Sequence, residues 1–190
     1  MEDPSNPPGH WPQSMGETLE AMNAATITVD QIWQTLNTIT DPEIPVVSLV
    51  EMGIARDVQI DGDTVVVTIT PTFAGCPAMH HMREEIFEKL RAMGVEKIEV
   101  RTVLNPPWTS EWISDEVRTK LRDFGLAPPP RLSAQAIQPA RLDILLMEAV
   151  ACPYCGSQDT TMENAFGPAL CQSIHYCRSC RQSFQRFKPL

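Results

Sequence analysis

Two Cys-x-x-Cys pairs near the carboxyl end constrain the fold of this chain more than any other feature. Cys152 and Cys155 form the first pair, and Cys177 and Cys180 form the second. Each pair can turn two thiolates toward one ion, and together they supply the closed tetrahedral sulfur shell of structural zinc. A segment of about forty residues buries too little apolar area to fold alone, whereas zinc binding contributes on the order of 10 kcal/mol. The spacing therefore predicts a zinc ribbon over residues 148–190.

The two Cys-x-x-Cys pairs do not by themselves fix which metal is bound or what the remaining cysteines do. Four thiolates do not distinguish zinc from an iron-sulfur or rubredoxin-like iron centre, so iron is the alternative metal. Cys171 is a fifth thiol without an assigned place in the ribbon. His175 stands beside a complete thiolate set, so we expect a surface or supporting role for it rather than a ligand role.

Charge and cysteine content limit the classes of partner and the compartment. The 190 residues carry 15 lysines and arginines against 24 acidic residues, a net charge of −9. Nucleic-acid binding draws on cationic neutralisation of phosphates, so nucleic acid is an unfavoured partner. The first residues are acidic and proline-rich, and no apolar run approaches the length of a membrane span. We therefore expect a cytoplasmic protein without a membrane partner, in which cysteines bind metal or react as thiols.

Hydrophobic periodicity ahead of the ribbon predicts an α+β domain. Apolar residues at helical spacing, β-branched runs joined by Asp-Gly-Asp, and stop signals at glycine and proline define its elements. Thr28 and Gln31 form a capping-box pattern at the start of the first helix. The order α-β-β-α-β-α follows, with helices at 28–39, 77–93 and 114–125 and strands at 54–60, 64–70 and 96–103.

Composition also divides the chain into segments. Residues 1–27 are expected to be disordered, and residues 28–125 form the α+β domain. Residues 126–147 are proline-rich without sustained periodicity, which is typical of a semi-rigid linker. The short apolar run at 141–150 is consistent with either a helix or a first strand of the ribbon.

Cys76 lies in the stretch TPTFAGCPAMHHM, directly before the second predicted helix. With Pro77 as first helical residue, Cys76 would be the N-cap, and unpaired N–H groups would point toward its sulfur. Such a position favours the thiolate and suits a nucleophile or a soft-metal ligand. The alternative is a cysteine that packs as a small hydrophobe. His80 and His81 are adjacent, and we expect them to be a solvated pair.

Three carboxylates are candidates for an auxiliary role beside Cys76. Asp41, Glu43 and Glu51 lie in segments that could converge on the thiol, and carboxylates beside a thiolate would suit a transient iron site. The alternative is that Asp41 forms a turn with Pro42 and that Glu51 is a surface charge. The chain has no recognisable hydrolase, phosphate-loop or dinucleotide motif, so catalysis of its own is not indicated.

Two sets of motifs resemble known families. DPEIPVVSLVEMGI at 41–54 and TPTFAGCP at 70–77 are similar to the iron-sulfur cluster assembly domain of bacterial and eukaryotic cluster-maturation factors, over about residues 28–125. PPWTSEWIS at 106–114 and FGPALCQSIHYCRSC at 166–180 resemble, more narrowly, the PaaD family of the phenylacetyl-CoA epoxidase system of phenylacetate degradation. The tail, FKPL, departs from relatives that end with a further cysteine.

The resemblance implies an accessory protein that helps to mature the iron centres of a multicomponent oxygenase. The implied partners are the di-iron oxygenase subunit and the iron-sulfur reductase, and the implied functional thiol is Cys76. Zinc would then be structural, and an iron ion or iron-sulfur cluster would be held transiently. Two alternatives are a non-catalytic structural subunit of the epoxidase complex and a thiol oxidoreductase. The latter is weakened because two facing Cys-x-x-Cys pairs are better explained by a closed metal site.

Overall fold

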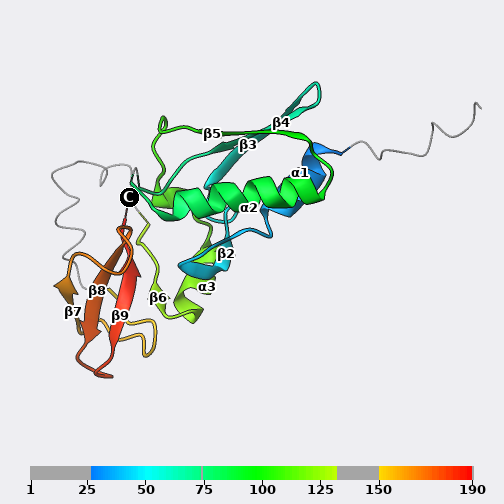
Figure 1. Ribbon diagram of the computed structural model, residues 1–190. Coiled ribbons are helices and arrows are strands. Elements are labelled where there is room, and N and C mark those ends of the chain that lie inside the picture. The colour runs from blue at the N-terminus through cyan, green and yellow to red at the C-terminus, as the bar shows by residue number, and fades with distance from the viewer. Residues whose placement is uncertain (1–26, 74, 132–149, 190) are drawn as a thin grey trace, which may run out of the picture.

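The computed structural model describes residues 27–73, 75–131 and 150–189 (Figure 1). The disorder predicted for residues 1–27 falls outside these residues except at Ile27. Most of the predicted linker and the apolar run at 141–149 also fall outside them. Within the described part of the chain, no helix combines the length and apolar character needed to cross a bilayer.

The first helix, α1 (Val29–Leu36), begins with the predicted capping box. The Thr28 hydroxyl accepts the Gln31 N–H at 3.3 Å, and the Gln31 side chain accepts the Thr28 N–H at 2.9 Å. The helix ends earlier than predicted because Ile39 leaves it: the Ile39 carbonyl accepts the Leu49 N–H at 2.9 Å. Ile39 is nevertheless fully buried. Its place in the apolar pattern therefore reflects burial in the core and not an extension of the helix.

The segment Asp41–Pro45 forms a small hairpin where the sequence predicted only a loop. Strands β1 (Thr40–Asp41) and β2 (Ile44–Ser48) pair antiparallel, with Asp41 opposite Ile44. An Asp41 carboxylate oxygen accepts the Glu43 N–H at 2.8 Å, which fixes the turn between the strands. Pro45 is tolerated because an isolated two-stranded pair does not need every N–H.

A three-stranded sheet forms the centre of the α+β unit, here called the assembly unit (residues 27–125). Strands β3 (Ala55–Asp61) and β4 (Thr64–Ile69) pair antiparallel around Gly62, whose φ of +60° suits a tight turn. The helix α2 (Ala78–Ala92) then crosses over to β5 (Lys97–Thr102), which pairs parallel with β4. Figure 1 shows α2 running along this sheet. The predicted order of large elements is confirmed.

The last part of the assembly unit contains η1 (Ser110–Trp112) and α3 (Asp115–Asp123). The Ser114 hydroxyl caps α3 by accepting the Val117 N–H at 3.2 Å. Trp108 is buried just before η1 and donates its indole N–H to the Met52 carbonyl at 2.8 Å. This bond satisfies the polar group of a large core side chain.

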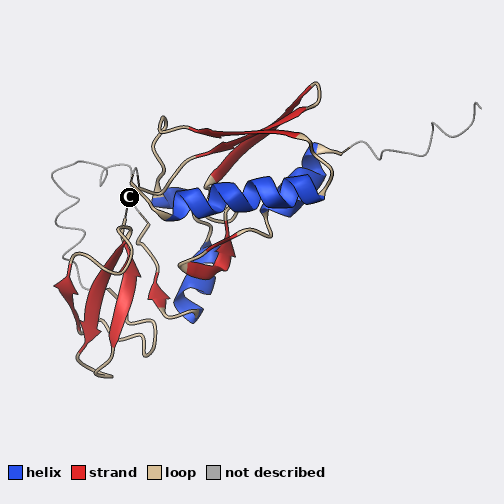
Figure 2. Cartoon of the chain, viewed as in Figure 1, coloured by secondary structure: helices blue, strands red, loops and turns tan. Residues whose placement is uncertain are grey.

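The carboxy-terminal unit, here called the ribbon (residues 150–189), is built on a four-stranded sheet (Figure 2). Its order is β6-β9-β8-β7, formed by Leu126–Ala127, Ser183–Phe187, Gln172–Cys177 and Thr160–Asn164. Strand β6 lies within the stretch predicted as linker, and it pairs parallel with β9. The polypeptide leaving the assembly unit is thus part of the ribbon sheet from its first residues.

The two units share one hydrophobic core. Phe187 is 1% exposed, and its ring centroid lies 5.7 Å from that of Trp108. Ala169 and Cys171 of the ribbon belong to the same buried cluster as Met82 of α2. The ribbon's separate buried cluster consists of Ala127, Cys152, Cys177 and Phe184. A cluster this small agrees with the expectation that metal binding substitutes for a core.

We expect Phe187→Ala to destabilise the assembly unit and the ribbon together, because the ring fills the core that they share. Removing a buried phenylalanine typically costs about 3–5 kcal/mol of unfolding free energy. Chemical denaturation followed by tryptophan fluorescence reports the assembly unit, and limited proteolysis reports the ribbon. Phe166→Ala is the control, since that ring is 67% exposed, and it should change stability by less than about 0.5 kcal/mol. Loss of the ribbon alone would contradict the shared core.

Candidate metal and thiol sites

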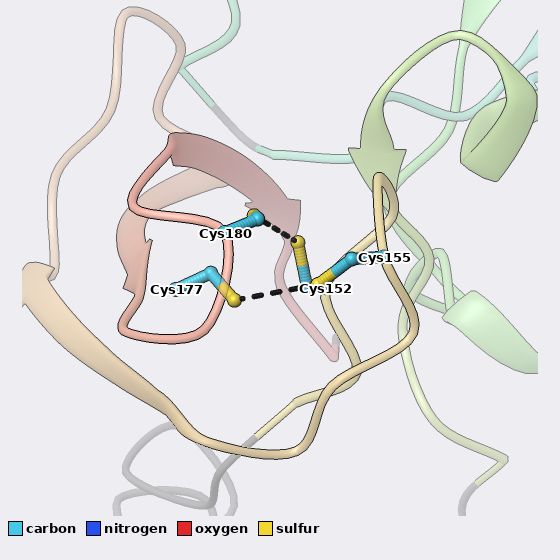
Figure 3. Close-up of side chains that lie close together, drawn as sticks. All are labelled: Cys152, Cys155, Cys177 and Cys180. Carbon is cyan, nitrogen blue, oxygen red and sulfur yellow. Dashed lines mark hydrogen bonds between the residues drawn. The ribbon is translucent and has the colours of Figure 1, made fainter.

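The four cysteines of the two Cys-x-x-Cys pairs converge on one point (Figure 3). The sulfurs of Cys152 and Cys180 lie 3.7 Å apart, and those of Cys155 and Cys177 lie 3.6 Å apart. All four sulfurs lie within 4.8 Å of one another. A tetrahedral ion with metal–sulfur bonds of about 2.3 Å requires sulfurs about 3.8 Å apart. The cluster therefore fits a single tetrahedrally bound metal ion.

Matching backbone turns position the two pairs. Gly156 donates its N–H to the Cys152 carbonyl at 2.8 Å, and Arg181 donates its N–H to the Cys177 carbonyl at 2.8 Å. Both residues have positive φ, +74° for Gly156 and +59° for Arg181. The N–H of Cys180 faces the Cys177 sulfur and is the largest influence lowering the pKa of that thiol to about 7. The second turn thus favours the thiolate form of Cys177, which is the form that binds metal.

Cys76 lies in the loop that leads into α2, and its side chain is half-buried. Its N–H donates to the Phe73 carbonyl at 3.0 Å, which holds the loop in a turn. The helix begins at Ala78, one residue later than predicted, although Pro77 already has helical φ and ψ of −67° and −27°. The N-cap is therefore Pro77, and the prediction of Cys76 as N-cap is wrong, although backbone N–H groups of Ala78 and Met79 do act on the Cys76 sulfur.

The predicted ionisation of Cys76 is wrong. Burial raises the pKa of the Cys76 thiol above its ordinary value, and the charges of Asp41 and Glu43 raise it further. The two N–H groups at the helix start act in the opposite direction but are outweighed. The sequence argument counted the helix terminus and omitted the carboxylates that the fold brings beside the sulfur.

Two of the three candidate carboxylates act on Cys76, and the third is engaged elsewhere. Asp41 is 8% exposed, and burial raises the pKa of its carboxyl. Glu43 is exposed, and burial of part of its side chain together with the Asp41 charge raises its pKa. The Glu51 carboxylate accepts the Ser48 N–H at 2.9 Å and forms an ion pair with Lys120. Glu51 therefore serves to connect β2 to α3.

Cys171, which the sequence left without a role, lies with Cys76 in the wall of one cavity. The cavity has a volume of about 250 Å³. Burial raises the pKa of the Cys171 thiol to about 12, with Asp41, Glu43 and Cys76 adding to the effect. No local pattern marks this residue, because its partners come from β1, from the turn between β1 and β2, and from the loop before α2. The residues lining the cavity are Glu43, Thr72, Phe73, Gly75, Cys76, Pro77, Pro168, Ala169, Leu170 and Cys171.

None of the three histidines that the structure describes belongs to the four-cysteine cluster or lines the cavity beside Cys76. His80 and His81 are exposed on α2 and face Glu84 and Glu85 at 3.2 and 3.9 Å, as expected for a solvated pair. His175 is fully buried in β8, not at the surface. Its Nε2 lies 3.1 Å from the Ser173 hydroxyl and its ring stacks on Phe184. Burial lowers the pKa of His175 to about 4, so it is neutral and serves as a packing residue.

Comparisons with known proteins match both units. Residues 29–103 match the family model described as iron-sulfur cluster assembly protein, and residues 138–188 match the PaaD zinc beta ribbon domain. An Escherichia coli (strain K12) protein, provisionally named as a 1,2-phenylacetyl-CoA epoxidase subunit, is 37% identical over 160 residues, covering 84% of this chain and 92% of that protein.

Two further proteins are similar to about half of this chain. A Porphyromonas gingivalis (strain W83) protein named Fe-S protein maturation auxiliary factor is 31% identical over 96 residues, covering 50% of this chain and 90% of that protein. The crystal structure of a domain of unknown function, DUF59, from Bacillus anthracis has 32% identity and a TM-score of 0.45, covering 48% of this chain and 89% of that one.

We expect Asp41→Asn to stabilise the protein increasingly as pH rises above about 4, the ordinary pKa of an aspartate. The pKa of the Asp41 carboxyl is higher in the folded protein than in the unfolded chain, so the folded parent binds more protons above that pH. The unfolding free energy of the parent therefore falls as pH rises. Asparagine removes the charge but keeps an oxygen to accept the Glu43 N–H. Thermal unfolding of variant and parent at several pH values from about 3 to about 8 measures the difference, which should grow from about pH 4 to the raised pKa of folded Asp41 and then stay constant.

Asp63→Asn is the control with the opposite sign. A hydrogen bond from Lys97 lowers the pKa of the exposed Asp63 carboxyl, so its ionised form is the stabilising one. That variant should lose slight stability near neutral pH. If Asp41→Asn instead lowers the melting temperature throughout the pH range, the ionised Asp41 carboxylate stabilises the fold, which would contradict a destabilising buried charge.

Proposed function

Because this chain belongs to the PaaD family of 1,2-phenylacetyl-CoA epoxidase subunits, we propose that it is an accessory protein that assists maturation or assembly of the iron centres of that epoxidase. Its clients are the di-iron oxygenase subunit or the iron-sulfur reductase. Oxidation of phenylacetyl-CoA belongs to those subunits, and this chain has no catalytic activity of its own. Similarity of the assembly unit to iron-sulfur maturation factors supports the accessory role.

The observation that carries this proposal is the position of Cys76 beside two carboxylates in the wall of an accessible cavity. Asp41 and Glu43 both act on the Cys76 sulfur, and Glu43 also lines the cavity. Thiolate is a ligand that iron-sulfur centres select, and negative charge beside it favours a bound cation. The raised thiol pKa means that Cys76 stays protonated until a cation binds, since binding a metal releases the proton. These properties suit a group that accepts iron and releases it.

The ribbon has a separate, structural role in this proposal. Its four thiolates form a closed set, and we assign zinc to them because structural zinc sites are closed and tetrahedral. The metal holds the turns that precede β7 and follow β8. The ribbon in turn packs on the assembly unit through Phe187.

We expect one zinc ion per chain, bound by the four ribbon cysteines. Cys152→Ser should lose the zinc and unfold the ribbon, because metal binding supplies most of the module's stability, on the order of 10 kcal/mol. Elemental analysis measures the zinc, and limited proteolysis of residues 150–189 measures the folding. Ser179→Ala is the control: it removes only an exposed hydrogen bond to Ser157 and should keep the zinc. Iron in place of zinc, or a folded ribbon after chelation, would contradict the assignment.

We expect Cys76→Ser to leave the protein folded but to deprive its clients of iron. Serine has nearly the volume of cysteine and accepts the N–H groups of Ala78 and Met79, whereas its hydroxyl binds iron weakly. The measurement is the iron content of the oxygenase and reductase purified from cells that carry the variant, with growth on phenylacetate as a second readout. We expect a loss of at least about tenfold, the range seen when groups at a metal site are altered.

His80→Ala is the matched control for Cys76→Ser. His80 is an exposed residue in the first turn of α2, close to Cys76 in sequence, and it does not line the cavity. Clients from that strain should contain normal iron. Equal client iron in the Cys76→Ser and parent strains would refute the maturation role and favour a purely structural subunit.

A further inference from the structure

Cys171 is held opposite Cys76 by contacts of the ribbon with itself and with the assembly unit. It precedes β8, and its carbonyl accepts the Lys188 N–H from the end of β9 at 2.9 Å. The neighbouring Ala169 carbonyl accepts the Gln172 N–H at 3.0 Å, which closes the turn that carries the thiol. Cys171 is 7% exposed and lies in the core shared by the two units. Its position is therefore fixed by the fold.

We propose that Cys171 of the ribbon and Cys76 of the assembly unit together bind the iron cargo as its two thiolate ligands, with the Glu43 carboxylate supplying negative charge at the same cavity. This inference rests on the proposed function and names a ligand that the assembly unit alone does not contain. Binding of one divalent ion by the two thiols forms two metal–sulfur bonds and releases two protons to solvent. No change of oxidation state is involved.

The charges around the cavity support a cation as occupant. Cys76, Cys171, Asp41 and Glu43 are all acids: Asp41 and Glu43 raise the pKa values of both thiols, and Cys76 also raises that of Cys171. Lys188 is the facing cation, and its amino group donates to the Leu170 carbonyl at 2.9 Å. Burial lowers the pKa of this amine. A divalent ion would offset the mutual repulsion of ionised thiols and carboxylates far better than one amine.

The site also differs from the ribbon cluster in a way that suits cargo. Among residues 27–73, 75–131 and 150–189, the ribbon sulfurs are the one set of three or more cysteine, histidine or acidic ligand atoms gathered within 4.8 Å. The Cys76 and Cys171 thiols share a cavity of about 250 Å³ without being drawn into such a cluster. A closed, preformed shell retains its ion, whereas an open site with few ligands leaves coordination positions for a client.

The test uses the full chain with zinc in the ribbon, titrated without oxygen with Co²⁺ as the probe. Thiolate-to-cobalt absorption counts the sulfur ligands of the added ion. We expect the parent to bind one cobalt per chain with the intensity of two thiolates. Cys171→Ala and Cys76→Ser should each keep about half of that intensity and bind cobalt at least about tenfold more weakly. The double variant should lose the band.

Three controls make the result specific. Zinc content, measured before and after titration, shows that cobalt has not replaced the ribbon metal. Leu170→Ala changes an exposed residue of the same cavity that has no ligand atom, and it should bind cobalt as the parent does. Cys171→Ser, closer in volume to cysteine than alanine is, tests whether loss of packing at this buried position explains the effect. Like Cys171→Ala, it should keep only about half of the thiolate-to-cobalt intensity and bind cobalt more weakly than the parent.

The outcomes separate this inference from the proposed function. Cobalt binding by Cys171→Ala with the affinity and intensity of the parent would overturn a ligand role for Cys171. If Cys76→Ser still starves the clients of iron in that case, the maturation role stands without the ribbon thiol. If both variants lose cobalt but client iron is normal, the site binds metal and the maturation role fails.

Discussion

The packing of Phe187 against Trp108 is the interaction on which the rest of this structure depends. The two rings, 5.7 Å apart, come from the last strand of the ribbon and from the loop before η1. They join the cores of two units that would otherwise be separate, and Trp108 is itself anchored by its bond to the Met52 carbonyl. Because of this junction, the turn that carries Cys171 lies against the loop that carries Cys76. The ribbon is therefore more than a metal-stabilised appendage: its placement completes a cavity.

That cavity concentrates groups that cost stability in the absence of a bound cation. Burial raises the pKa values of Asp41 and of the two thiols that line the cavity, and the charges of Asp41 and Glu43 raise those of the thiols further. A protein selected only for stability would replace Asp41 with a neutral residue that still closes the β1–β2 turn. Perturbed acids that cluster at a cavity are typical of functional sites, where a ligand supplies the missing charge. The same buried acids therefore lower the stability of the free protein and supply the proposed binding site for a cation.

Local patterns in the sequence predicted the parts of the fold that depend on nearby residues. The capping box of Thr28 and Gln31, the turn at Gly62 and the two Cys-x-x-Cys turns are each defined within a few positions, and all are found. The β1–β2 hairpin was missed because its prolines argue against strands. Strand β6 and the pairing of Cys76 with Cys171 could not be predicted, because each joins residues far apart in sequence. The ionisation of Cys76 failed for the same reason: Asp41 and Glu43 reach it only through the fold.

Strand β6 joins the end of the assembly unit directly to the ribbon sheet. Leu126 and Ala127 pair with Gln185 and Arg186, so the chain enters the ribbon sheet before it reaches the first cysteine turn. Only two residues separate the end of α3 at Asp123 from Leu126, so the orientation of α3 also sets where the edge of the ribbon sheet begins. A change of one in the number of residues between α3 and β6 would reverse the faces of Leu126 and Ala127, both of which are buried, and would be felt in the ribbon as well as in the assembly unit.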